Sequence, residues 1–414
     1  MSLAGVVGMR GSFAAVVIRR FVLFTFVWSS CLLGSLLAGS AWEHVSEHGL
    51  RQALAEHEAV LVAFILPNEP KSAALEPEWI SAAAAAATAE GQGQQQHLIS
   101  IDCVSSEAAC RRFGVASTAP TQIQLFQQGH PVATYRGARR AEALLSFLAR
   151  RSRPMVTNIH APHELASFKT ADEIVFVAFL DTDDSPFATL FSELAARYRD
   201  EFTFGLVVDG SLAEAEGILK TPTVVCYRSV DGETSTFTPA LQDPDALDAW
   251  VKHASRLVLG DLTVWNRQRL LDRGWPMVYL FASTSTQRAD LQSSLRRFAK
   301  SYYDSLTCVL VDPLEFPELV AQMGFEQPGV VFPAGAVHQL SKDRIYPYPQ
   351  GRAFTSANVQ QWGLDVYQGR VKPWTPPGVT TVYEDLAPTM VATRRVSIWS
   401  FPGVKVRVGG HGEL

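Results

Sequence analysis

The chain has 414 residues, of which 47% are hydrophobic and 19% are charged, and its formal net charge is −5. This composition excludes a largely disordered chain, and the length suits about three domains of roughly 100 residues each. The acidic balance, without a Lys/Arg-rich run, excludes the basic footprint of a nucleic-acid-binding protein.

The N-terminal segment, residues 1–41, is predicted to be a signal peptide or a signal anchor. Arg10, Arg19 and Arg20 precede the run FVLFTFVWSSCLLGSLLAGSA, which carries no charge and ends in small residues. The small residues favour cleavage, although the run is also long enough to span a membrane as an anchor. Either outcome directs the body of the chain into the secretory pathway, and membrane association is expected only for an uncleaved anchor.

Beyond Cys31 in that segment, four cysteines lie in the body of the chain. Cys103 and Cys110 are close together in IDCVSSEAACRRFGV, which fits a short-range structural disulfide in an oxidising compartment. Cys226 and Cys308 lie in apolar, strand-like runs and are expected to be buried, inert thiols. No two cysteines have the Cys-x-x-Cys spacing.

The body of the chain repeats with a period near 105 residues. Each unit has an apolar strand, a helical pattern, a second strand that runs toward an aspartate, a glycine, and a proline that opens a further strand. The order of these elements indicates an α/β fold, and the matched prolines suggest a special backbone such as a cis peptide. In chain order the three strands lie near Phe64, Phe179 and Phe281, the aspartates are Asp102, Asp209 and Asp312, the glycines are Gly114, Gly217 and Gly324, and the prolines are Pro120, Pro222 and Pro328.

These features together resemble the thioredoxin fold, and their three-fold arrangement resembles protein disulfide isomerase. VTNIHAPHELASFKTADEIVFVAFLDTDD is similar to the opening of that family's second domain, and YQGRVKPWTPPG is similar to the segment that closes its third. The Cys103–Cys110 spacing also matches the family's structural disulfide. The resemblance implies three tandem thioredoxin-like domains, each with a central mixed sheet flanked by helices, and a last catalytic domain that is missing or truncated. The expected domains are 42–152 (the first, catalytic type in the family), 153–258 (the second), 259–368 (the third, client-binding), followed by a linker and irregular tail at 369–414.

The family's active-site pattern falls on VLVAFILPNEPKSAALEPEW, residues 60–79. Glu69 stands in place of the attacking cysteine, Ser72 in place of the second cysteine, and Ala63 in place of a buried proton-carrying glutamate. Disulfide exchange requires a thiolate, and a serine hydroxyl is not ionised near pH 7. We therefore expect no catalytic residues and no enzyme activity, and we expect the Glu69 carboxylate to cap the following helix.

Two further residues match family positions around this turn. Pro120 matches the cis-proline that faces the active turn and helps to hold substrate backbone. Arg139 in YRGARRAEALLSFL matches a catalytic arginine, but with its partner chemistry missing we expect it to be a solvated arginine at a helix start.

A member of the family without cysteines is still expected to bind unfolded or partly folded secretory proteins through the third domain. The apolar pocket of that domain falls on Val278, Leu280, Leu295 and Leu306, with Phe332 in the same region. Apolar residues at such positions are also the usual core of a domain. Two alternatives stay open: a scaffold dedicated to one secretory partner, and residual thiol–disulfide exchange through Cys103 and Cys110.

The chain ends in His411, Gly412, Glu413 and Leu414, one residue away from the HDEL retrieval signal. This ending predicts the lumen of the endoplasmic reticulum as the location and a retrieval receptor as a further partner. No metal or cofactor is predicted, since His160 and His163 in HAPH supply two metal ligands at most.

Overall fold

The computed structural model describes residues 42–90, 97–115, 121–183, 185–238, 243–325 and 329–376. The predicted signal segment, the tail beyond residue 376, Pro120 and Pro328 lie outside the described residues. Among the helices that are described, none is both long and apolar enough to cross a bilayer. The described residues from Val45 onward belong to one compact unit.

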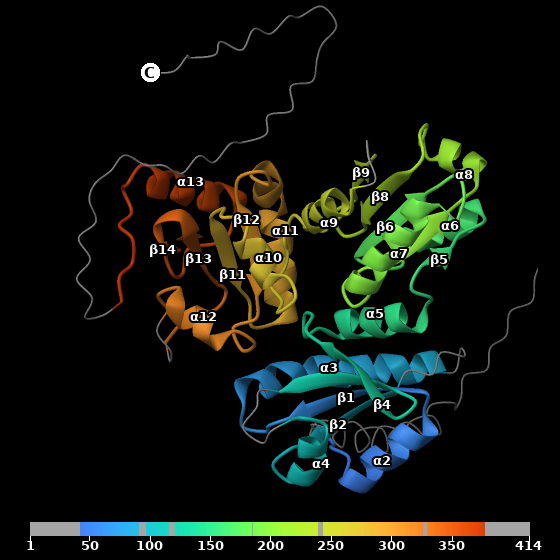
Figure 1. Cartoon of the computed structure of the whole chain (residues 1–414). Coiled ribbons are helices and arrows are strands. Elements are labelled where there is room, and N and C mark those ends of the chain that lie inside the picture. Colours follow the sequence, from blue (N-terminus) through green and yellow to red (C-terminus); the bar gives the residue numbers. More distant parts are fainter. Residues whose placement is uncertain are drawn as a thin grey trace, which may run out of the picture. The chain divides into compact units, whose positions relative to one another are not determined.

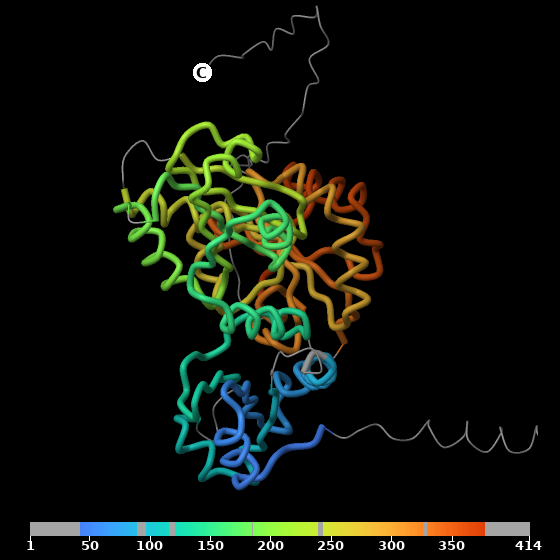
Figure 2. Tube along the Cα trace, turned by 90° about the vertical axis from the view of Figure 1, so that its right-hand side faces the viewer, coloured from blue at the N-terminus to red at the C-terminus, as the bar shows by residue number. Residues whose placement is uncertain are grey.

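The first domain has a four-stranded mixed sheet in the order β2-β1-β3-β4, in which β1 pairs parallel with β2 and antiparallel with β3. Figures 1 and 2 show it in blue to blue-green. Its elements are α2 (Glu47–Glu56), β1 (Ala59–Ile65), α3 (Pro70–Glu90), β2 (His97–Asp102), α4 (Glu107–Arg112), β3 (Gln122–Gln127), β4 (His130–Tyr135) and α5 (Ala141–Ser152).

The second domain has a five-stranded sheet in the order β5-β7-β6-β8-β9. Alternate residues of its central strand enter two different cores: Phe176 and Ala178 lie on one face, and Val177 on the other. Burial of both faces explains why such central strands are continuous apolar runs. The elements are β5 (Thr157–Asn158), α6 (Pro162–Phe168), β6 (Ile174–Phe179), α7 (Pro186–Tyr198), β7 (Thr203–Val207), α8 (Gly210–Ala215), β8 (Thr223–Arg228), β9 (Glu233–Phe237) and α9 (Pro244–Ala254).

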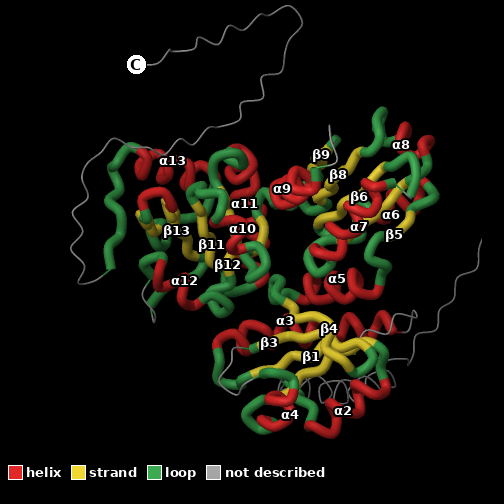
Figure 3. The backbone as a smooth tube through the Cα atoms, in the orientation of Figure 1, coloured by secondary structure: helices red, strands yellow, loops and turns green. Residues whose placement is uncertain are grey.

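The third domain repeats this topology, with a sheet in the order β10-β12-β11-β13-β14. Figure 3 shows its strands (yellow) among the helices (red). The elements are β10 (Gly260–Asp261), α10 (Arg267–Leu271), β11 (Met277–Phe281), α11 (Ser285–Ser301), β12 (Thr307–Val311), α12 (Pro317–Gln322), β13 (Ala334–Gln339), the 3-10 turn η1 (Leu340–Lys342), β14 (Arg344–Pro347) and α13 (Ser356–Tyr367). The predicted α/β class, with mixed sheets flanked by helices, is confirmed.

The repeated glycines have a common conformational reason. Gly114, Gly217 and Gly324 have φ values of 77°, 75° and 84°, and each follows one of the short helices α4, α8 and α12. A residue in the left-handed region ends a helix, and glycine adopts that region without a steric penalty. The sequence repeat therefore marks the same helix end three times.

The repeated prolines agree less well with the predicted register. The Thr221–Pro222 peptide bond is cis and directly precedes β8. In the third domain the strand that corresponds to β8 begins at Ala334, directly after a cis Phe332–Pro333 bond. The residue that opens β13 is therefore Pro333, five positions beyond the predicted Pro328. PGVVFP contains two prolines, and the sequence period alone selected the earlier one.

Candidate functional site

The turn between β1 and α3 is closed by a chain of hydrogen bonds centred on Ser72. The Leu66 amide donates to Ser72 Oγ at 3.2 Å, and Ser72 Oγ lies 2.6 Å from Thr121 Oγ1. Thr121 Oγ1 donates its one proton to Glu69 Oε2 at 2.7 Å, so Ser72 must donate to Thr121. Ser72, which stands in place of the second cysteine, is thus buried, and its hydroxyl both accepts and donates a hydrogen bond.

Glu69 is held by Thr121 rather than by the helix that it precedes. Its Oε2 atom accepts from the Thr121 amide at 2.7 Å as well as from the Thr121 hydroxyl. Both bonds are charge-assisted and therefore among the stronger hydrogen bonds of a protein. The prediction that the Glu69 carboxylate caps α3 is wrong, because the carboxylate binds Thr121 and so connects two loops of the first domain. We call Glu69, Ser72 and Thr121 the polar clasp.

Arg139 is not the solvated arginine expected from the sequence. Its side chain is 12% exposed and donates to the Lys71 carbonyl at 3.0 Å and to the Thr121 carbonyl at 2.9 Å. Arg139 therefore joins both sides of the polar clasp. Its solvation is lost because Glu315 of the third domain lies over it, with Oε1 3.7 Å from Arg139 Nε.

Glu315 lies in the turn between β12 and α12 and is buried. Burial raises the pKa of its carboxyl to about 8, against the opposing charge of Arg139 and with a further rise from Asp312. Burial stabilises the neutral form of a carboxyl, and a single guanidinium at this distance offsets that effect only in part. At pH 7 burial therefore favours the neutral form of the Glu315 carboxyl over the ion pair with Arg139.

Sequence reasoning missed Thr121 and Glu315. Thr121 directly follows Pro120, and a hydroxyl or amide beside that proline is a signal that could have been used. Glu315 carries no sequence signal, since its neighbours in the site come from the first repeat. Ala63, as expected from its position, lies fully buried in the middle of β1, where its methyl group can neither take up nor release a proton.

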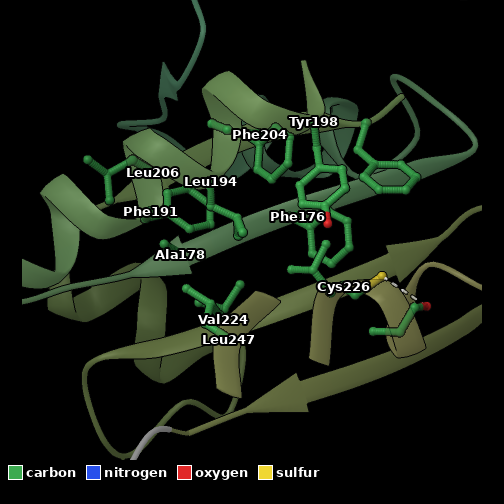
Figure 4. Packing of buried hydrophobic residues seen from close by; sticks show 14 of the residues in the cluster. Phe176, Ala178, Phe191, Leu194, Tyr198, Phe204, Leu206, Val224, Cys226 and Leu247 are labelled. Carbon is green, nitrogen blue, oxygen red and sulfur yellow. Dashed lines mark hydrogen bonds between the residues drawn. The ribbon is translucent and has the colours of Figure 1, made fainter. Parts of the chain in front are cut away.

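None of the cysteines in the described residues is an available nucleophile. Cys103 and Cys110 form a disulfide, and both residues are buried in the core of the first domain. Cys226 and Cys308 are free and buried, and burial raises the pKa of each thiol to about 12. Figure 4 shows Cys226 among the aromatic core of the second domain. Its Sγ donates to the Ala254 carbonyl at 3.5 Å.

The predicted client-binding residues do not all lie together. Val278, Leu280 and Leu295 belong to one core cluster of the third domain, and Leu306 packs against it. Phe332 packs against the cluster on the opposite face of the sheet, so its placement with the other four is wrong. Residues alternate between faces along β11, and Phe332 precedes β13 on the side that faces α12.

An apolar groove of about 250 Å³ opens between α11 and α13, which pack side by side (Figure 1). Two of the predicted residues line it, Val278 and Leu306. Leu280 and Leu295 are buried core residues instead. At the rim, Leu364 is 42% exposed and Tyr367 is 39% exposed. We call this the α11/α13 groove; its other lining residues are Phe298, Tyr302, Val337, Val359, Gln360, Trp362, Gly363 and Val366.

Within the described residues, no group of three or more histidine, cysteine, aspartate or glutamate side chains is placed to hold a metal ion. His160 and His163 both lie near the carboxylate of Glu164, which accepts from the amides of His160 and Ala161. This arrangement is that of a helix start at α6, and it accounts for the HAPH motif without a ligand.

Comparison with known proteins gives two matching family models: one described as "Thioredoxin" matches residues 42–150, and one described as "Thioredoxin-like domain" matches residues 179–363. The chain is 29% identical over 356 residues to protein disulfide-isomerase of Aspergillus oryzae, covering 84% of this chain and 67% of that protein. It is 27% identical to the protein disulfide-isomerase of Aspergillus niger (77% and 59% covered) and to human protein disulfide-isomerase A2 (80% and 63% covered). The chain thus spans about three fifths to two thirds of the length of these relatives.

Among solved structures, human ERp44 form II aligns with a TM-score of 0.36 and 17% identity, over 80% of this chain and 90% of that one. The bb fragment of ERp72 aligns with a TM-score of 0.42 and 15% identity, over 53% of this chain and 100% of that one.

Proposed function

The chain belongs to the protein disulfide isomerase family, and we propose that it is a member without dithiol chemistry that binds unfolded secretory proteins non-covalently in the lumen of the endoplasmic reticulum. The observation that carries this proposal is the polar clasp. Exchange needs a thiolate that is exposed at the start of α3 and a second thiol to release the product. At that place the chain has a carboxylate and a buried hydroxyl, each bonded to Thr121.

The polar clasp also affects what the loop at Thr121 can bind. The amide of Thr121 is engaged by Glu69, and its carbonyl is engaged by Arg139. An extended client that approached this loop would have to displace two charge-assisted hydrogen bonds, which stabilise a site by about 1.5–3 kcal/mol each. This cost supports a binding surface elsewhere on the molecule.

The α11/α13 groove is the surface that we assign to client binding. Its volume of about 250 Å³ and its lining of valine, phenylalanine, tyrosine and tryptophan suit one large apolar side chain of an unfolded segment. Unfolded chains expose such side chains regardless of their exact sequence, so one apolar groove accepts many clients. The similarity to protein disulfide-isomerases supports the luminal location.

The test uses aggregation of a cysteine-free client, so that thiol exchange cannot contribute. The purified protein should suppress aggregation, should not reduce insulin, and should not reactivate scrambled ribonuclease. Leu364→Ser should weaken suppression about 3-fold or more, because the rim of the groove loses its half-exposed apolar side chain. Leu219→Ser is the matched control, since Leu219 is 88% exposed and lies in the second domain.

Three results would count against the proposal. Activity in the insulin or ribonuclease assay would contradict the absence of dithiol chemistry. Equal suppression by the Leu364 and Leu219 variants would remove the groove from client binding. Failure to suppress aggregation, together with recovery of one stoichiometric partner from the secretory lumen, would instead favour a dedicated scaffold.

A further inference from the structure

Arg256, in the connection between α9 and β10, is a buried charge without an acceptor. Its residue is 7% exposed, and none of its three guanidinium nitrogens has a hydrogen-bond partner within the part of the chain that the structure describes. A buried cation is costly unless it is paired and hydrogen-bonded. Buried guanidinium groups in proteins accordingly face a carboxylate, a carbonyl or a bound anion.

Two aromatic rings hold the Arg256 side chain in place. Its guanidinium carbon lies 3.5 Å from the Tyr303 ring centroid and 5.3 Å from that of Trp275. The Tyr303 hydroxyl donates to the Arg256 carbonyl at 2.7 Å, which fixes the backbone as well. The cation–π contacts attract the guanidinium, but all three of its nitrogens still lack a hydrogen-bond partner among the described residues. The guanidinium is therefore held by the two rings while its N–H donors remain available to a ligand.

Further donors line the same cavity as Arg256. It has a volume of about 750 Å³, and Arg273, His253 and Thr307 line it together with Arg256. Thr307 is 2% exposed, and its Oγ1 atom also lacks a hydrogen-bond partner among the described residues. Arg273 stacks on Trp275, 4.0 Å from its centroid. Burial and the charge of Arg256 lower the pKa of Arg273 to about 10, with Tyr303 and Asp304 acting in the opposite direction.

The carboxylates that line this cavity are occupied by other groups. Asp172 pairs with Arg150 at 2.7 Å, Glu201 with Arg269 at 3.0 Å, and Asp272 accepts from Gln268 at 2.7 Å. Glu173 and Asp261 both pair with Arg140, at 3.0 and 2.6 Å. Asp304 is close enough to raise the pKa of Arg273 and of His253, and a single carboxylate does not balance two guanidinium groups. The charge of the corner around Arg256 is therefore positive.

We propose that Arg256, Arg273 and Thr307 form a binding site for a phosphoryl group, either as free phosphate or on a small phosphate monoester. A planar guanidinium edge binds two oxygens of a tetrahedral oxyanion, and the threonine hydroxyl supplies a donor to a third. The volume of the cavity exceeds that of a phosphate ion and leaves room for the organic part of a monoester. This site is separate from both the polar clasp and the α11/α13 groove.

The experiment measures binding by calorimetry and thermal unfolding with the full chain at pH 7. The probes are sodium phosphate and glycerol phosphate, each against sodium chloride at equal ionic strength, since screening alone changes with salt. Both phosphates should raise the unfolding temperature where chloride does not. Tighter binding of glycerol phosphate would identify a monoester as the ligand, and tighter binding of inorganic phosphate would identify the free ion.

The variants separate a site from a general salt effect. Arg256→Met should weaken phosphate binding about 10-fold or more, as expected for the loss of a charge-assisted pair, and Thr307→Val should weaken it less. Arg297→Gln removes an exposed arginine of α11 and should leave binding unchanged. Arg256→Lys keeps the charge without the planar fork, so it tests the same site if the methionine variant does not fold. Absence of phosphate binding in the unmodified protein, or equal binding by the Arg256, Thr307 and Arg297 variants, would overturn the proposal.

Discussion

Removal of the Glu69 carboxylate is the sharpest test of the polar clasp. In Glu69→Ala the Thr121 amide loses its acceptor, and the Thr121 hydroxyl loses the acceptor of its proton. The remaining bond between Ser72 Oγ and Thr121 Oγ1, at 2.6 Å, uses only one of the two hydroxyl protons, so two donors are left unsatisfied. A hydrogen bond to a charged group contributes about 1.5–3 kcal/mol, and we expect the first domain to lose about that much. For a domain of about 100 residues this corresponds to a fall in unfolding temperature of several degrees per kcal/mol.

The assay is urea unfolding of the full chain, followed by a signal from the first domain, with Glu69→Gln as the control. Glutamine keeps an acceptor oxygen but not the charge, so it should lose less than half as much stability as alanine. A double-mutant cycle with Thr121→Val should show coupling between the two residues, because they share the bond that is removed. A loss below about 0.5 kcal/mol in Glu69→Ala, or the absence of coupling, would refute the reasoning.

Three further predictions concern stability. With a folded-state pKa of about 8, Glu315 binds a proton more tightly in the folded than in the unfolded protein, so its contribution to stability falls as pH rises from about 4.5 to 8. The Glu315→Gln variant should therefore gain stability relative to the unmodified protein as pH rises, in unfolding measured at pH 5, 6.5 and 8. A difference in stability that stays constant over this range would contradict the burial argument. Gly205→Ala should destabilise the second domain by about 1–3 kcal/mol in thermal unfolding, since the new Cβ would lie 2.5 Å from the Phe168 ring, and an unchanged unfolding temperature would show that the ring moves freely. Replacement of Cys103 and Cys110 by serine should cost about 2–3 kcal/mol by the loop-entropy relation for a short loop, measured by urea unfolding, and equal stability in the presence and absence of the disulfide would contradict it.

The local pattern of the chain determined much of the fold. Strands such as β6 and β11 are apolar runs because both faces of the central strand are buried. Such an apolar run is recognisable in the sequence alone. The glycines at 114, 217 and 324 mark helix ends for a conformational reason that acts within a few residues. The presence of Glu69 and Ser72 at the start of α3, with no cysteine beside them, is likewise a property of the sequence alone.

The side-chain partners were decided by tertiary structure. Arg139 was predicted to be solvated because the residues near it in the sequence give no sign of its contact with Glu315. The packing of the third domain brings Glu315 to Arg139. Phe332 was assigned to the wrong face because it precedes β13, which begins at Ala334, and contacts with other elements place it against the second core cluster. Within a strand the face reverses with each residue, so an error of an odd number of positions in register moves a residue to the other face of the sheet. Sequence periodicity fixes which residues are buried, but contacts between distant elements fix what each buried group meets, and the chemistry of the polar clasp and of Arg256 depends on the second.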